Sequence, residues 1–136
     1  MSKSNAWENA LLLLLFNNTN AANIGDATGL RGSTTAGSLY LSLHTADPGE
    51  AGNQTTNEAA YTSYARKAVA RSGAGWTVAS NSAVLAANAD FVTATGGSET
   101  ETYFGIGTDP SGAGTLLYSG TISPNIVVSN GVTPTL

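Results

Sequence analysis

The 136 residues include 5 Lys and Arg, 9 Asp and Glu and no Cys, which gives a formal net charge of −4. This acidic balance argues against nucleic acid as a partner, because backbone phosphates are bound by clustered Lys and Arg. The absence of Cys excludes disulfides, thiolate metal sites and a cysteine nucleophile. Charged residues make up 10% of the chain, against about a quarter in typical domains. Small uncharged residues replace them, as at surfaces that pack inside an assembly.

Residues 5–17 predict an N-terminal helix. Asn5 is the expected N-cap, with Glu8 reaching back to its amide as in a capping box. The five successive leucines of Leu11–Leu15 leave such a helix apolar on every side, so either its own sheet or neighbouring copies must cover it. The apolar run is far shorter than the about 20 residues that span a bilayer, and no membrane partner is expected. Glu8 just before the run also argues against a signal peptide.

The rest of the chain predicts an arm followed by β-structure. Residues 18–36 are mostly Gly, Asn, Thr and Ala, with Ile24 and Leu30 as the possible anchors, and are typical of an extended arm or loop. Short strands are expected at residues 38–44, 64–72, 75–79, 90–94, 100–107, 114–120 and 125–129, between Gly, Pro and Asn turns; residues 83–89 could instead be helical.

This pattern predicts a mainly β fold, a single-domain antiparallel β-sandwich or barrel with a short N-terminal α-helix. Residues 1–36 would form the helix and arm, and residues 37–136 one β-domain that folds as a unit.

Three local patterns carry further expectations. Leu39, Leu41 and Leu43 alternate along a strand and should share a buried face, whereas residues 46–58 have almost no apolar surface and should lie on the outside or against a partner. Glu99 and Glu101 share one strand face and suit a solvated rim. Glycines 105 and 107 indicate a bulge or a close backbone approach.

A search for chemistry among the residues finds no catalytic set. His44 is the single histidine, no serine occupies a nucleophile elbow, and His44 is expected to be a surface or interface residue. Asp47 and Glu50 could bind Ca²⁺, but the EF-hand spacing is missing. The Gly105-Ile106-Gly107 run fails as a phosphate-binding motif because Pro110 replaces its last glycine. We therefore expect no enzyme, no metal and no cofactor.

A carbohydrate-binding module is one alternative function. Exposed aromatic rings could form a stacking platform for sugars, although Tyr and Trp more often lie in cores and interfaces. The candidate rings are Tyr40, Tyr61, Tyr64, Trp76 and Tyr103.

The order and spacing of several segments resemble a family of small virion proteins of tailed bacteriophages, whose members are described as head-decoration or tail-fibre proteins. The likeness runs over nearly the whole chain, from the leucine-rich helix onward. Its main segments are Leu39–Gly52, Tyr61–Arg66, Tyr103–Thr108, Gly112–Gly120 and Val128–Pro134.

The resemblance implies a virion structural protein without catalytic residues. We expect a capsid decoration, or cement, protein on the head exterior, made in the host cytoplasm. Its partners would be the major capsid protein and copies of itself in a homotrimer. A tail or tail-fibre component is the alternative that uses the same scaffold. The expected interface residues are Trp7, Leu11, Leu14, Leu15, Ile24, Leu30, Asp47 and Glu50.

Overall fold

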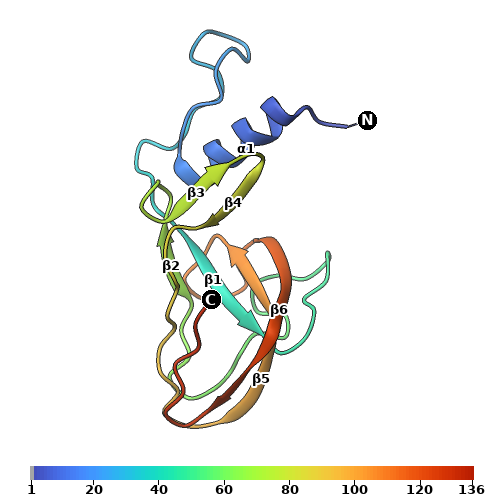
Figure 1. The fold of residues 1–136 in the computed structure, drawn as a ribbon, viewed down its shortest axis with the longest axis vertical. Helices are drawn as coiled ribbons and strands as arrows, with labels where there is room; N and C mark the ends of the chain where they lie inside the picture. The colour runs from blue at the N-terminus through green and yellow to red at the C-terminus, as the bar shows by residue number, and fades with distance from the viewer. Residues whose placement is uncertain (1) are drawn as a thin grey trace. The chain divides into compact units, whose positions relative to one another are not determined.

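The computed structural model describes residues 2–136 (Figure 1). One helix precedes antiparallel strands, which confirms the predicted mainly β class. The elements are α1 (Asn5–Asn17), β1 (Ser38–His44), β2 (Lys67–Ala70), β3 (Trp76–Ala79), β4 (Ser82–Leu85), β5 (Ser98–Gly107) and β6 (Leu116–Ser129). Within the described residues, no helix is long and apolar enough to cross a membrane. The chain divides into two compact units, one formed by the residues up to 38 with 69–87, the other by 39–68 with 88–136.

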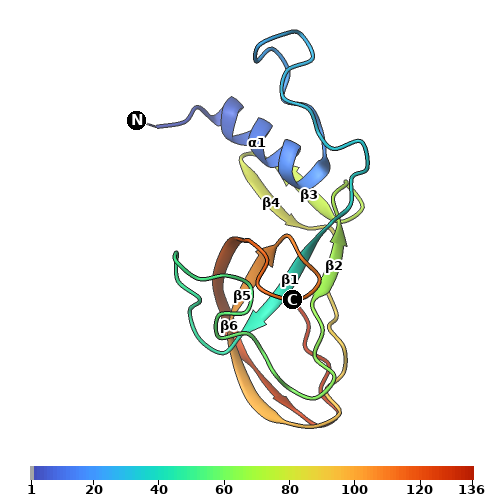
Figure 2. The same cartoon turned by 180° about the vertical axis from the view of Figure 1, so that it is seen from behind.

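In the first unit, α1 packs on the two-stranded antiparallel sheet of β3 and β4 (Figure 2). Phe16 is the buried residue of the helix, and its ring centroid lies 4.7 Å from that of Trp76. The N-cap is Ser4 and not the predicted Asn5, because the Ser4 hydroxyl accepts a hydrogen bond from the backbone N–H of Trp7 at 3.3 Å. The predicted helix range is otherwise confirmed.

Arg71 holds the end of α1 in place. No basic residue lies in the last turn of the helix. Arg71, which follows β2, instead donates to the carbonyls of Leu14 at 3.0 Å and Leu15 at 2.6 Å, and to that of Ala36 at 3.0 Å. A cation at this point also interacts favourably with the negative, C-terminal end of the helix dipole. The Arg71 side chain thereby connects the end of α1, the end of the 18–36 segment and the chain that leads into β3.

Residues 18–36 form a closed loop where an extended arm was one expectation. Ala21 and Leu30 form an antiparallel bridge with two backbone hydrogen bonds of 2.9 Å. Asp26 turns the chain by accepting hydrogen bonds from Thr28 and Gly29, and these bonds lower the pKa of its carboxyl group. Ile24 and Leu30 remain exposed.

The larger sheet has the strand order β2-β1-β5-β6, and β5 pairs antiparallel with β1 and with β6. Over the described residues this sheet stays open and forms no closed barrel. The alternation predicted for β1 is confirmed, since Leu39, Leu41 and Leu43 are all buried. They form the core of the second unit with Phe91, Ala94, Ile106 and Val128.

The predicted strand boundaries differ from the structure in several places. The expected strand 64–72 is shortened to β2, Lys67–Ala70. Residues 82–85 form β4, where a helix had been considered, because they pair with β3. Residues 90–94 form no strand, although Phe91 and Ala94 donate to the carbonyls of Pro134 and Val132. The expected strands 114–120 and 125–129 are one strand, β6, because β5 is long enough to pair with both parts.

Candidate functional site

Most of residues 46–58, in the loop between β1 and β2, are exposed as expected, but part of the loop packs against its own sheet. Gln54 in this loop is fully buried (0% exposed). The loop is joined to β1 through backbone hydrogen bonds from Thr45 to Asn57 and from Ala59 to Leu43. Polar partners within the unit satisfy its side chains, so a segment with little apolar surface can still pack against its own sheet.

His44 lies beneath this loop and is fully buried (0% exposed), which corrects the prediction of a surface or interface histidine. Its Nδ1 is 2.9 Å from the Thr56 carbonyl and its Nε2 is 2.8 Å from Ser42 Oγ. A carbonyl only accepts, so Nδ1 carries the proton and Nε2 accepts from the Ser42 hydroxyl when the ring is neutral. Burial lowers the pKa of His44 and favours this neutral form.

The Ser42–His44 pair has the atoms of a nucleophile and a base but not their setting. Both side chains are fully buried, so no substrate atom can reach Ser42 Oγ in this structure. The third position is a backbone carbonyl, where a catalytic triad places a carboxylate. The pair therefore stabilises the packing of the loop on the sheet.

Two glycines of β5 make room for this layer of polar side chains. A Cβ on Gly105 would lie 2.5 Å from Ser42 Oγ and 2.7 Å from His44 Nε2. A Cβ on Gly107 would lie 2.1 Å from Cδ of Gln54. The close approach predicted for these glycines is confirmed, and side chains of the β1 strand and the loop fill the space.

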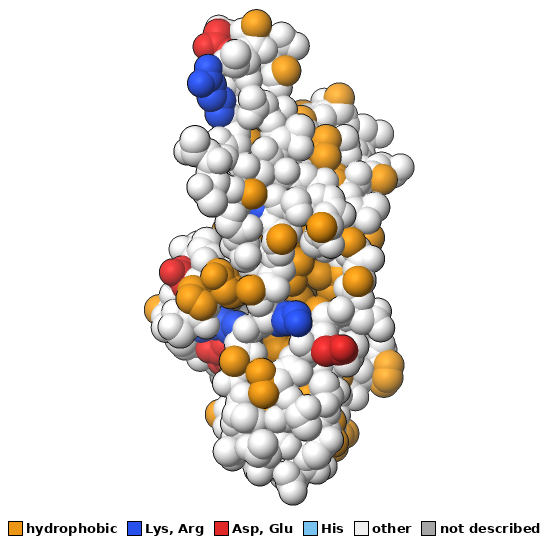
Figure 3. Space-filling view, turned by 90° about the vertical axis from the view of Figure 1, so that its left-hand side faces the viewer, with side chains coloured by type: hydrophobic (Ala, Val, Ile, Leu, Met, Phe, Trp, Pro, Cys, Tyr) orange, Lys and Arg blue, Asp and Glu red, His pale blue; other side chains and the backbone are white. Residues whose placement is uncertain are grey.

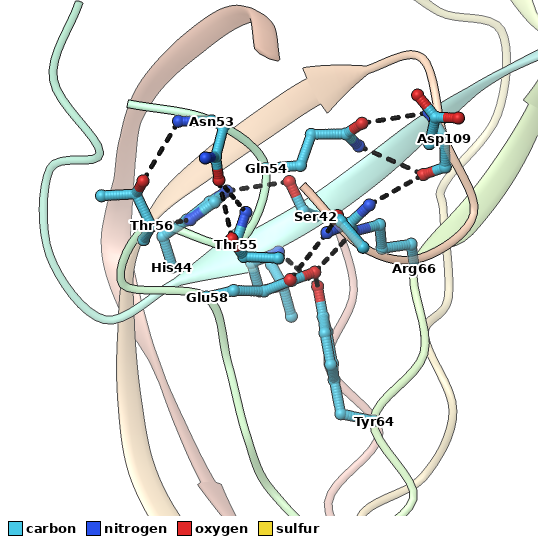
Figure 4. A network of polar contacts seen from close by, with 12 residues as sticks. Ser42, His44, Asn53, Gln54, Thr55, Thr56, Glu58, Tyr64, Arg66 and Asp109 are labelled. Carbon is cyan, nitrogen blue, oxygen red and sulfur yellow. Dashed lines mark hydrogen bonds and ion pairs between the residues drawn. The ribbon is translucent and has the colours of Figure 1, made fainter. Parts of the chain in front are cut away.

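A buried ion pair anchors the other end of the loop (Figure 4). Arg66 Nε donates to Glu58 Oε1 at 2.6 Å, and Nη2 donates to Glu58 Oε2 at 2.8 Å. The Tyr64 hydroxyl donates to Glu58 at 3.0 Å and accepts the Leu43 N–H at 3.1 Å. Burial raises the pKa of Tyr64, and the bond to Glu58 raises that of Arg66. Tyr64 therefore stays protonated and Arg66 stays charged near neutral pH.

The same network reaches the connection between β5 and β6. Arg66 donates to the carbonyls of Asp109 at 2.9 Å and Gly112 at 2.7 Å. The side-chain oxygen of Gln54 accepts a hydrogen bond from the backbone N–H of Asp109 at 3.0 Å. The backbone N–H of Gln54 donates to the carbonyl of Ala113 at 2.9 Å. Two loops far apart in the sequence are thus fixed to each other (Figure 4).

A groove of about 370 Å³ lies between the loop that follows β1 and the start of β6. One wall is formed by residues of the loop, the other by four successive residues at the start of β6. The lining residues are Asp47, Gly49, Glu50, Gly52, Leu116, Leu117, Tyr118 and Ser119. Asp47 and Glu50, two of the predicted contact residues, are exposed and share one wall. Sequence reasoning missed the opposite wall because only folding brings it there.

Residues Trp7, Leu11, Leu14 and Leu15, the other predicted contacts on α1, are all partly exposed, as are Ile24 and Leu30 in the 18–36 loop. These six belong to the first unit, and Asp47 and Glu50 belong to the second. Among residues 2–136, no group of three or more acidic or His side chains could hold a metal ion.

The predicted aromatic platform does not form a stacking surface. Trp76 is buried against Phe16 in the first unit. In the second unit Tyr61 is buried, and its hydroxyl donates to the Val92 carbonyl. Tyr64 lies in the ion-pair network. These rings serve the packing of their own units.

Glu101 is buried where a solvated rim was expected. Its side chain is 0% exposed, and neither carboxyl oxygen has a hydrogen-bond partner among the described residues when it is ionised. Burial, and then the charge of Glu99, raise its pKa to about 8. Glu99 is also turned inward, since it accepts the N–H groups of Ala60 and Tyr61 at 2.9 and 2.7 Å. At neutral pH Glu101 keeps its proton and can donate it to the Glu99 carboxylate.

A family model described as Podophage GP4 fiber I protein gp80 matches residues 2–136. The chain belongs to this family, and it is a structural protein of a tailed-phage virion, as its resemblance implied. A search of the curated proteins found no match to the chain.

Proposed function

We propose that this member of the fibre family is a tail-fibre component that assembles with further copies of itself through α1. The observation that carries the proposal is the exposure of the helix. Each of Leu11–Leu15 is partly exposed, and within residues 5–17 only Phe16 is buried. A helix that is apolar on every side is stable in water only when other surfaces cover it.

The physical basis of assembly is burial of apolar area. Burying apolar surface yields roughly 25 cal/mol per Å², and α1 offers leucines on the sides that β3 and β4 leave open. Trp7 and Glu8 lie at the start of the same helix, so one aromatic anchor is available. The proposed role needs no catalytic step, cofactor, nucleic acid or membrane.

The test is the oligomeric state of the purified chain and its place in the virion. Leu14→Asp should shift the assembled species to monomer in sedimentation and abolish incorporation into particles. Val84→Asp is the matched control, because Val84 is an exposed apolar residue of the same unit (54% exposed) on β4. A monomeric parent chain, or normal incorporation of the Leu14→Asp variant with an intact circular-dichroism spectrum, would overturn the proposal.

Capsid decoration is the second candidate, and the scarcity of charge on both units favours it. One face of the molecule carries few charged side chains among uncharged ones (Figure 3). A homotrimer on the head exterior that bridges major capsid subunits would cover such faces widely. An electron-microscopy map of the virion separates the two: hundreds of copies on the head favour decoration, and a few copies at the tail favour the fibre.

A further inference from the structure

One side of α1 lies on the β3–β4 hairpin and the opposite side does not. Phe16 is buried, and so is the side-chain oxygen of Asn9, seven residues earlier. Positions seven apart lie on the same side of a helix with 3.6 residues per turn, so this side faces the hairpin (Figure 2). By the same period, Trp7, Leu11 and Leu14 lie on the opposite side, where they are partly exposed.

This outer side of α1 carries a narrow apolar stripe. Trp7, Leu11 and Leu14 follow one another at intervals of four and three residues, which is the spacing of a helix that packs along another helix. The stripe covers about two turns, or about 10 Å of helix. Because it is short, charges at its two ends can decide in which direction a partner helix runs.

Glu8, at the first end of the stripe, has no cation to pair with. It is the one charged residue of the helix, and no hydrogen bond or ion pair of its carboxylate is found among residues 2–136. The predicted capping box is not formed, because Ser4 caps the helix through the backbone N–H of Trp7. The Glu8 carboxylate is therefore left without a role inside its own unit.

Arg71, at the other end of the stripe, has no anion to pair with. Its guanidinium donates to backbone carbonyls, among them those of Leu14 and Leu15, and to the hydroxyl of Ser33. No carboxylate of the described residues lies within ion-pair distance of it. The first unit thus presents one unmatched negative charge and one unmatched positive charge at opposite ends of one apolar stripe.

A second copy of the chain matches both charges when its helix runs antiparallel. If a twofold axis passes at the level of Leu11, the residue three positions before it lies level with the residue three positions after it in the other copy. Glu8 of each copy is then level with Leu14 of the other, whose carbonyl binds Arg71. A parallel pair would instead place Glu8 beside Glu8 of the second copy, and like charges repel.

We propose that α1 packs antiparallel on α1 of a second copy, with an ion pair between Glu8 of each copy and Arg71 of the other. The contact is isologous, so the same stripe serves both copies. Burial of the stripe provides the affinity, and the two ion pairs set the direction. The inference rests on the proposed assembly through α1 and adds the orientation of the helices and the charged residues that select it.

The first test is Glu8→Gln, measured by sedimentation of the full chain. This substitution keeps the length of the side chain and removes only its charge. The dissociation constant of the pair should rise roughly tenfold, because each dimer loses two ion pairs, and its dependence on salt should largely disappear. Parallel helices predict the opposite sign, since the same substitution would relieve a repulsion. Asp26→Asn, which removes one carboxylate from the same unit and keeps the oxygen that Thr28 and Gly29 bind, should leave the constant unchanged.

The partner of Glu8 is identified by a double-mutant cycle. In an Arg71→Gln background, whose own effect on α1 is measured first, Glu8→Gln should cause no further weakening. A full tenfold loss in that background would show that Arg71 is not the partner and would overturn the proposed ion pair.

The direction of the helices has a separate readout, because the chain contains no Cys and a single one can be labelled. Ala6 is exposed near the start of α1, and Ala6→Cys can carry a nitroxide. In the antiparallel pair the two labels lie about 15 Å apart along the helix axis, in addition to the separation of the helices. In a parallel pair they lie at one level, separated only by the about 8–10 Å between the axes. Electron paramagnetic resonance measures this distance.

Three results would overturn the inference while assembly through α1 still stands: a Glu8→Gln constant that is unchanged or lower, labels at one level, or a trimeric parent, whose helices run parallel around the threefold axis. A monomeric parent, or a Leu14→Asp variant that still assembles, is instead the failure of the proposed function itself. Circular dichroism of each variant shows whether the helix is intact.

Discussion

Arg66 donates hydrogen bonds to both carboxyl oxygens of Glu58, with Nε 2.6 Å from Oε1 and Nη2 2.8 Å from Oε2. The side chains are 2% and 14% exposed, so water screens the pair weakly. Arg66 Nη1 and Nη2 also donate to the carbonyls of Asp109 and Gly112. This one side chain therefore fixes the loop, the β5–β6 connection and, through Glu58, the hydroxyl of Tyr64.

Replacement of Arg66 by Met should destabilise the second unit by about 3–5 kcal/mol, because it leaves the Glu58 carboxylate buried without its partner. Denaturant unfolding, followed by the fluorescence of the tyrosines, measures the change. Arg66→Lys keeps the charge but loses the two-pronged contact and should fall between Met and the parent. Lys67→Met, at the exposed neighbouring residue, is the control. A stability for Arg66→Met equal to that of this control would contradict the prediction.

Gly105→Ala should cost about 1–3 kcal/mol or more, because the new methyl group would meet Ser42 Oγ and His44 Nε2 at less than contact distance. Gly73→Ala is the matched control, since a Cβ there meets no atom within 4 Å. Thermal melting of the two variants makes the comparison. If both melt alike, the polar layer under the loop is not tightly packed.

Arg71→Ala should loosen the end of α1. The substitution leaves the carbonyls of Leu14, Leu15 and Ala36 without this donor and removes a cation from the helix C-terminus, at a cost of about 1–3 kcal/mol. Faster hydrogen exchange of α1 amides, with unchanged exchange in β5, would bear this out. Uniform acceleration in both units would instead indicate that the two unfold together.

Glu101 makes stability fall as the pH rises. Its pKa is about 8 in the folded chain against an ordinary value of 4.5. Between these values the folded chain holds a proton that the unfolded chain has lost, so the free energy of unfolding decreases by at most about 1.4 kcal/mol per pH unit. Glu101→Gln has no titrating carboxyl group at this position. Its free energy of unfolding should therefore fall less steeply as the pH rises above the ordinary pKa of a glutamate. An unchanged pH profile in this variant would rule out a buried, protonated Glu101.

His44 contributes with the opposite sign. Burial lowers its pKa in the folded chain, so the unfolded chain binds the extra proton and stability falls as the pH drops below about 6.5. His44→Gln should remove this acid-side loss while Glu101→Gln leaves it in place. Urea unfolding across the acid range measures the free energy of unfolding of both variants. If the parent and His44→Gln lose stability equally as the pH falls, a lowered pKa of His44 is refuted.

The features that sequence alone determined are local ones. The leucine-rich helix, the alternating leucines of β1 and the close approach at Gly105 each follow from neighbouring residues, because helix and strand periods and glycine sterics act over short range. The family likeness rests on the same local order of segments. The predicted N-cap, Asn5, was wrong by one residue, because Ser4 caps the helix and both residue types favour this position.

Only the tertiary structure determined which polar residues are buried and which partners they have. Gln54 bonds Asp109, Arg66 bonds Gly112, and His44 lies under the loop that follows it, so residues that look solvated in the sequence are buried. The same holds for Glu101, and for the groove that joins Asp47 to Tyr118. A polar side chain can be buried only where its partners meet it, and long-range pairing, which no local pattern encodes, brings those partners together.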